Sequence, residues 1–268
     1  MRIFGSAIIS MACVCMTGLA SVAAQEAQGM SADQNGVDSG DWDIQAGAIA
    51  IAGNDYPGAD AIQGMVVPYF DVSWRDRYFI DPIRGIGVQW GGGRDVPYSL
   101  QAGIAWDFGR DEDDSAALRG LGDLDGGPAL RIAGDYRLGY ISLGATLMQS
   151  LGGDTGTELV LNAGTRLPAG ERLTIIPSVR ATIGNDERHD AFFGVMPDQA
   201  AASIYTPYDP DGGVTSYGVQ LVGFYDITDR LFATGIIASD TLTGDAADSP
   251  IVEREDQLFI ALGLVRKF

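Results

Sequence analysis

Apolar side chains alternate with small or polar ones along many short segments of this chain, most clearly in segment 257–268. One face of that segment is apolar apart from one arginine: Leu258, Ile260, Leu262, Leu264, Arg266 and Phe268. The other face is small or polar: Gln257, Ala261, Gly263 and Lys267. A period of two predicts a β-strand, because successive side chains point to opposite faces of a sheet. The pattern is typical of the last strand of a membrane barrel, and an edge strand of a soluble sandwich is the alternative.

Segment 98–108 predicts a strand that crosses a membrane. Its apolar face consists of Tyr98, Leu100, Ala102, Ile104, Trp106 and Phe108. Aromatic residues stand at both ends of that face with aliphatic residues between them, as expected where a strand meets both membrane interfaces. About 11 residues also suffice for a tilted barrel strand to cross the hydrocarbon layer.

Further alternating segments predict the rest of a barrel wall. They occupy residues 42–52, 65–75, 128–138, 140–150, 157–167, 171–184, 217–225 and 230–240, with two short strands inside 77–91. Tight connections at 138–139, 168–170 and 226–229 largely alternate with long ones at 109–127, 185–214 and 241–255. Outer-membrane barrels have short periplasmic turns and longer outer loops, and lipid tolerates no open sheet edge. We therefore predict an all-β fold, a transmembrane antiparallel up-and-down β-barrel.

The strand count depends on segment 77–91. If both ends of the barrel chain are periplasmic, the number of strands is even, and Asp81-Pro82 then separates an outward strand from a returning one. We predict about 12 strands, with 10 as the alternative. Pro68 lies inside a predicted strand, where it fits an edge, a bulge or an irregular position because proline cannot donate to a ladder.

The first residues predict export. Arg2 precedes an apolar run over residues 3–20, and small residues at 21–24 offer a cleavage site after Ala24. We interpret 1–24 as a signal peptide, 25–41 as a disordered periplasmic leader and 42–268 as the barrel. Cys13 and Cys15 both lie in the signal peptide, so the mature chain has no cysteine. The predicted location is the outer membrane of a Gram-negative bacterium.

Charge and motifs argue against nucleic-acid binding and against catalysis. The formal net charge is −19, whereas phosphate binding needs clustered basic residues. The acidic residues predict solvated outer loops, with bound divalent cations as the alternative. The single histidine, His189, lies on the longest loop and is expected to be solvated. Asp123–Gly126 resembles a calcium loop but lacks the downstream glutamate. We predict no enzyme activity, no catalytic or metal site and no cofactor.

Charged residues on the inward faces of the predicted strands predict a charged lumen. They are Arg131, Asp135, Arg137, Glu158, Arg166 and Arg180. A barrel of this size has a lumen that side chains largely fill or that leaves a narrow water path. These groups therefore either pair and plug the barrel or line a channel.

Several motifs resemble the MipA/OmpV family of outer-membrane proteins. The most specific is the run Gly244-Asp-Ala-Ala-Asp-Ser-Pro-Ile-Val252. Others are 193–203, Gly212-Gly213, 225–229, Gly109-Arg110, 118–123 and Trp42 with Tyr56-Pro-Gly58. Family-motif residues on predicted outer loops are Phe193, Gly194, Val195, Pro197, Ala200, Ser203, Gly244, Asp245, Asp248, Ser249 and Pro250. Packing of these loops over the barrel mouth is the favoured interpretation, and a ligand site is the alternative.

The resemblance implies a non-enzymatic scaffold linked to murein synthesis and remodelling. Its expected partners are outer-membrane lipid, a periplasmic murein transglycosylase and a murein synthase, with the barrel-assembly machinery during biogenesis. We interpret Phe268 as the terminal assembly signal. Two other functions stay open from the residues alone. One is a narrow porin or small-molecule channel with a charged lumen, and the other is a structural or adhesive surface protein acting through acidic outer loops.

Overall fold

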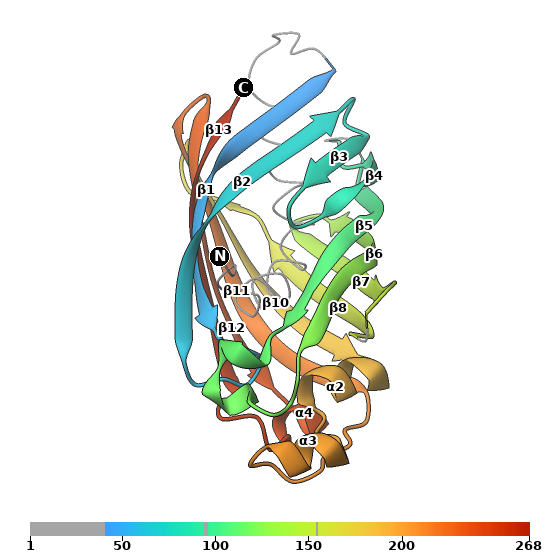
Figure 1. Cartoon of the computed structure of the whole chain (residues 1–268). Helices are drawn as coiled ribbons and strands as arrows, with labels where there is room; N and C mark the ends of the chain where they lie inside the picture. The colour runs from blue at the N-terminus through green and yellow to red at the C-terminus, as the bar shows by residue number, and fades with distance from the viewer. Residues whose placement is uncertain (1–40, 94–95, 154) are drawn as a thin grey trace.

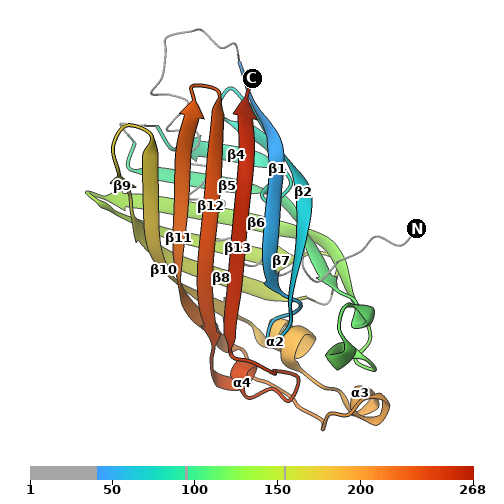
Figure 2. The same ribbon diagram turned by 90° about the vertical axis from the view of Figure 1, so that its left-hand side faces the viewer.

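The first and last strands of the chain pair with each other, and this closes the sheet into a barrel (Figures 1 and 2). In the computed structural model, which describes residues 41–93, 96–153 and 155–268, all neighbouring strands are antiparallel and β10 pairs with β11 to complete the ring. The strands are β1 (Trp42–Asn54), β2 (Ile62–Trp74), β3 (Tyr78–Asp81), β4 (Gly85–Gly91), β5 (Tyr98–Arg110), β6 (Leu124–Leu138), β7 (Ile141–Ser150), β8 (Thr157–Thr165), β9 (Leu167–Pro168), β10 (Leu173–Gly184), β11 (Gly213–Thr228), β12 (Leu231–Leu242) and β13 (Asp256–Lys267). The predicted signal peptide and the leader up to residue 40 lie outside the described residues.

The prediction of 12 strands is confirmed. β8 and β9 follow each other in the chain and both pair with β10, so the two segments form one strand of the wall. β3 and β4 are the two short strands expected in 77–91. Asp81 starts the turn between them, because its Oδ1 accepts the backbone N–H groups of Ile83 and Arg84 at 2.6 and 2.7 Å.

The two ends of the barrel differ in their connections. At the short-turn end, residues 75–77, 92–97, 139–140, 169–172 and 229–230 join the strands. At the loop end lie 55–61, 111–123, 151–156, 185–212 and 243–255, which carry η1 (Glu112–Asp114), η2 (Ala116–Leu118), α2 (Asp186–Phe193), α3 (Pro197–Ala202) and α4 (Gly244–Ala247). The helices gather at this one end (Figure 2). Among the described residues, no helix is long and apolar enough to cross a membrane.

The outer surface of the barrel wall is apolar. Exposed aliphatic side chains such as Ile104, Leu262 and Leu264 alternate with inward-facing residues along the strands. Exposed aromatic residues concentrate at the short-turn end: Trp42, Tyr78, Trp90, Tyr98, Tyr136, Tyr140, Tyr225 and Phe268, with Trp74 half-buried among them. Trp106 and Tyr217 are their exposed counterparts near the loop end. An apolar band with aromatic residues at its borders is what a bilayer selects on a barrel wall.

Much of the lumen is an apolar core rather than the small and polar surface expected from the sequence. The cluster comprises Ile49, Ile51, Ile176, Val222, Phe224, Phe232, Ile236, Ala238, Phe259, Ala261 and Val265. These residues come from β1 and from β10 to β13, so one side of the barrel interior is packed like the core of a soluble protein. Charged residues occupy other parts of the lumen.

Candidate functional site

The connections at the loop end pack against one another. Four of them share a buried cluster of Tyr56, Ala59, Leu118, Leu121, Val195 and Ile251. The Tyr56 hydroxyl donates to the Ile251 carbonyl at 3.0 Å. Burial, followed by the nearby Glu253 carboxylate, raises the pKa of Tyr56 well above its usual value, which keeps this phenol a neutral donor. The outer loops therefore form one packed cap over the barrel mouth.

Arg188 on α2 fastens this cap to the barrel wall. Its Nη1 lies 3.0 Å from Asp107 Oδ2 on β5, and its Nη2 lies 3.1 Å from Glu158 Oε2 on β8. Nη1 also donates to the Thr155 carbonyl at 3.2 Å, and the guanidinium stacks 4.1 Å from the centroid of the Phe192 ring. Asn185 caps the helix by accepting the Arg188 N–H at 3.0 Å. One buried cation thus joins a loop helix to two separate strands.

The expectation of a solvated His189 is wrong. The side chain is 1% exposed and packs edge-on against Phe193. Its Nδ1 lies 2.6 Å from the Asp211 carbonyl oxygen, and its Nε2 lies 2.8 Å from Thr215 Oγ1. The burial of His189 could not be predicted from the sequence, because α2 is a short polar helix whose inner face becomes buried only when the loops pack together. With both ring nitrogens occupied, His189 has a structural role here.

The two motif-bearing loops contact each other. Ser249 Oγ donates to the Phe193 carbonyl at 2.5 Å, and Tyr208 Oη donates to the Asp245 carbonyl at 2.8 Å. Burial and the neighbouring Asp245 raise the pKa of Tyr208. Phe193, Val195 and Ser249 are buried, Gly194, Ala200, Ser203, Asp245 and Pro250 are half-buried, and Pro197, Gly244 and Asp248 are exposed. The motifs thus lie where the outer loops pack, and Pro197 stays outside that packing.

Polar side chains from two strands contact each other in the lumen over a glycine on the strand between them. Arg180 on β10 and Asp240 on β12 form a buried ion pair through two contacts, Nε to Oδ1 at 2.7 Å and Nη2 to Oδ2. Gly218 on β11 lies opposite both residues in register. A Cβ at Gly218 would come within 2.2 Å of Asp240 Oδ1. In the same way, a Cβ at Gly144 would meet the side-chain oxygens of Asp135 and Asn162 from the two flanking strands.

Replacing Gly218 with alanine is expected to lower the free energy of unfolding by roughly 1–3 kcal/mol, because the new methyl group displaces the Asp240 carboxylate from Arg180. Gly213→Ala on the same strand is the matched control, since its Cβ would meet no atom within 4 Å. Urea unfolding in lipid vesicles, followed by tryptophan fluorescence, measures both. Equal midpoints for the two variants would contradict the assignment of Gly218.

A second group of lumen charges centres on Arg84, which the sequence analysis did not single out. Its Nη2 donates to Asp71 Oδ2 at 2.5 Å, and its Nε lies 3.7 Å from Asp81 Oδ2. Arg131 is 1% exposed and donates from Nη1 to Gln101 Oε1 at 3.0 Å. Arg84 was missed because it sits in a turn, outside any alternating segment. Its position after Asp81-Pro82 was the available signal.

The other predicted lumen charges spread over both ends. Asp135 and Glu158 are buried, Glu158 against Arg188. Arg137 is half-buried at the short-turn end, where Nη2 donates to the carbonyls of Gly93 and Val96 at 3.1 and 3.0 Å. Arg166 is exposed between β8 and β9, so it is not one of the buried lumen groups. Phe268 is 69% exposed on the outer surface, and its N–H donates to the Ile44 carbonyl at 2.9 Å.

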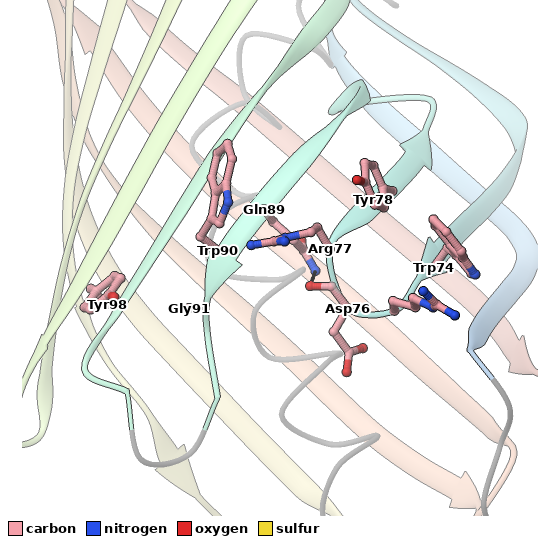
Figure 3. A pocket seen from close by; sticks show the side chains of 9 residues that line it. Trp74, Asp76, Arg77, Tyr78, Gln89, Trp90, Gly91 and Tyr98 are labelled. Atoms are coloured by element: carbon pink, nitrogen blue, oxygen red, sulfur yellow. Dashed lines mark hydrogen bonds between the residues drawn. The ribbon is translucent and has the colours of Figure 1, made fainter.

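A shallow pocket opens beside the 75–77 turn at the short-turn end (Figure 3). Its volume is about 540 Å³, and it is lined by Trp74, Arg75, Asp76, Arg77, Tyr78, Gln89, Trp90, Gly91 and Tyr98. Arg75 and Asp76 have positive φ angles of 53° and 50°, which side chains other than glycine rarely adopt. The turn is braced by an Arg75–Asp41 ion pair at 3.0 Å and by a Gln89 Nε2 bond to the Asp76 carbonyl at 3.2 Å. We call these residues the rim pocket.

Among residues 41–93, 96–153 and 155–268, no group of three or more His, Cys, Asp or Glu side chains could hold a metal ion. On α2, Asp190 has a raised pKa because of partial burial and because Asp209 and Asp186 lie close. The rim pocket combines aromatic rings with an arginine-bearing turn, a composition typical of protein-binding hot spots.

Comparisons with known proteins give a family and several barrels. A family model described as "MltA-interacting protein MipA" matches residues 46–268. Similar solved structures include OprB of Pseudomonas putida, at 9% identity and a TM-score of 0.41, covering 85% of this chain and 94% of that one. The channel DcaP of Acinetobacter baumannii has 10% identity, a TM-score of 0.35 and coverages of 85% and 97%. OprD of Pseudomonas aeruginosa has 14% identity, a TM-score of 0.37 and coverages of 85% and 65%. No curated protein matches the sequence.

Proposed function

This chain belongs to the MipA family of outer-membrane β-barrels, and from that membership we propose that it is a non-enzymatic scaffold for a periplasmic murein transglycosylase. The single observation that carries the proposal is the family match over nearly the whole barrel. The family's name is that of a protein that interacts with MltA, a lytic transglycosylase. A murein synthase is the second proposed partner.

The rim pocket is the surface we propose for this contact. In outer-membrane barrels the short turns face the periplasm, so the short-turn end is the side that a murein enzyme can reach. The rim pocket offers Trp74, Trp90 and the Arg75 guanidinium, which lies 4.7 Å from the Trp74 ring centroid. Aromatic residues at this level also anchor a barrel in the lipid interface. The positive φ angles of Arg75 and Asp76, with the Arg77 N–H bonded to the Trp74 carbonyl at 3.1 Å, are those of a type I′ turn, a usual connection of a tight hairpin.

The test is binding of the refolded barrel, in vesicles, to a purified MltA-type lytic transglycosylase by surface plasmon resonance. Trp74→Ala combined with Arg75→Ala is expected to weaken binding at least about tenfold, because hot-spot truncations cost about 2 kcal/mol or more. Trp106→Ala is the matched control, an exposed tryptophan near the loop end. No binding by the wild type, or an equal loss in the control, would reject the rim pocket as the docking surface.

We propose that the chain reaches the outer membrane through the signal peptide 1–24 and the barrel-assembly machinery, with Phe268 as the assembly signal. The terminal ring stands on the lipid-facing surface with the Arg266 guanidinium 5.1 Å from its centroid. Its exposure leaves it accessible to a partner before the strand closes onto β1.

A further inference from the structure

The wall of the barrel is incomplete between β2 and β5 at the loop end. The β3–β4 hairpin fills this space only near the short-turn end, where β3 pairs with residues 72–74 and β4 with residues 99–104. In the described parts of the chain, no strand pairs with residues 62–71 of β2 or 105–110 of β5 on their facing edges. β2 and β5 run on toward the loop end beyond the point where the hairpin stops (Figure 1). We call this space the wall gap.

Backbone polar groups line the wall gap. The Arg75 N–H donates toward β1, to Asp41, whereas the Trp74 carbonyl accepts the Arg77 N–H on the β3 side. Backbone groups alternate sides along a strand, so the even-numbered residues of β2 direct theirs into the gap. Pro68 is one of them, and it presents no N–H there. Unpaired backbone at membrane depth persists only where it lines a cavity or is covered, so the facing edges of β2 and β5 need something other than lipid tails beside them.

The lumen face of β2 beside the gap is apolar and incompletely covered. Met65, Val67 and Tyr69 are half-buried and pack against the apolar lumen cluster. Residues facing the lumen at the same level of β1, Ile49 and Ile51, are buried. The wall gap therefore borders an apolar surface of the lumen, against which Ile83 of the hairpin also packs. A hydrocarbon chain is the occupant that such a surface favours.

Guanidinium groups with free donors stand where the hairpin ends. Arg131 Nε and Nη2 and Arg84 Nε and Nη1 are buried and have no hydrogen-bond partner in the described structure. The two side chains are close enough to interact electrostatically. Arg84 is already paired with Asp71, whereas the hydrogen-bond acceptor of Arg131 is the neutral Gln101 amide, although the charges of Asp81 and Asp135 also act on Arg131. Buried donors without acceptors indicate an anionic ligand or water, and Arg131 is the stronger candidate to bind an anion.

We propose that the wall gap admits a long-chain carboxylate from the surrounding leaflet. Its alkyl chain lies along Met65, Val67 and Tyr69, and its carboxylate accepts hydrogen bonds from Arg131 with Arg84 beside it. An apolar surface and buried cationic donors beside the same gap match the two halves of such an amphiphile. The carboxylate fits because a planar guanidinium binds it through two parallel hydrogen bonds. This site lies away from the rim pocket and does not depend on its role.

Binding of radiolabelled palmitate to the mature barrel in neutral detergent tests the headgroup contact. Wild type is expected to bind palmitate at least about tenfold more tightly than Arg131→Gln does. It is expected to bind uncharged methyl palmitate no more tightly than Arg131→Gln binds palmitate. Arg131→Gln is preferred to an Arg84 variant, because replacing Arg84 would remove its buried ion pair with Asp71. Arg166→Gln is the control, an exposed arginine that should leave binding unchanged. Equal binding of methyl palmitate and palmitate, or preference for hexadecyl phosphate over palmitate, would overturn the proposal.

Single cysteines test the alkyl path without touching the arginines, since the mature chain has no cysteine of its own. Val67→Cys faces the lumen beside the gap, and Val66→Cys, its neighbour, is 71% exposed on the outer surface. Palmitate is expected to slow labelling of Val67→Cys by N-ethylmaleimide several-fold and to leave Val66→Cys unchanged. Equal rates with and without palmitate at Val67→Cys, or protection that tracks dimer formation instead, would contradict an alkyl chain in the wall gap.

Discussion

Replacing Arg188 with alanine is expected to lower the free energy of unfolding by about 3–5 kcal/mol, because it leaves Asp107 and Glu158 buried without their cation. The loss includes the stacking on Phe192 and the bond to the Thr155 carbonyl. Urea unfolding of the refolded barrel in vesicles gives the global effect. Hydrogen exchange of the α2 amides shows whether the helix also detaches from the wall.

Arg119→Ala is the matched control, because Arg119 is an exposed arginine in another loop of the same cap. It is expected to stay within about 0.5 kcal/mol of wild type. Arg188→Lys separates charge from shape, since a lysine carries the charge but cannot bridge two carboxylates through a planar fork. If Arg188→Ala unfolded at the same urea concentration as Arg119→Ala, α2 would have no energetic link to the barrel.

The wall of the barrel could be predicted because it depends on local alternation. Leu262 and Leu264 face outward in β13 as the period of two requires, and β3 ends at Asp81, where the turn to β4 begins. Strand parity then gave the count of 12, because a barrel in lipid must close. These features need only neighbouring residues and the properties of the bilayer.

The lumen and the cap could not be predicted in the same way. The Arg180–Asp240 pair joins residues 60 positions apart across Gly218, and Arg188 reaches Asp107 over a separation of 81. Ile49 and Ile51 of β1 join the cluster of Phe224, Phe232 and Phe259 only after β1 meets β13. Such contacts depend on which strands become neighbours and on how far each loop folds back. His189 shows the same dependence, since its burial follows from loop packing rather than from its own helix.

The packed lumen leads to a second large effect, on ion conductance. The mature wild-type barrel is expected to give no steady current in a planar bilayer, because Phe224, Phe232 and Phe259 fill one side of the lumen and the cap covers the loop end. Replacing these three residues with alanine removes large side chains that no neighbour can replace, and is expected to produce stable conductance steps. Heat-modifiable electrophoretic mobility verifies that each variant is folded.

Phe70→Ala is the control for this experiment, because Phe70 faces the bilayer and is 43% exposed. It should stay silent like the wild type. Steady current through the wild type would favour the narrow-porin function if Arg131→Ala or Arg180→Ala changed the conductance. A charged channel requires an open path past those guanidinium groups. A silent wild type with a conducting triple variant means that the packed lumen is not an ion channel. Function then lies elsewhere on the barrel, where the rim pocket and the wall gap are the sites to test.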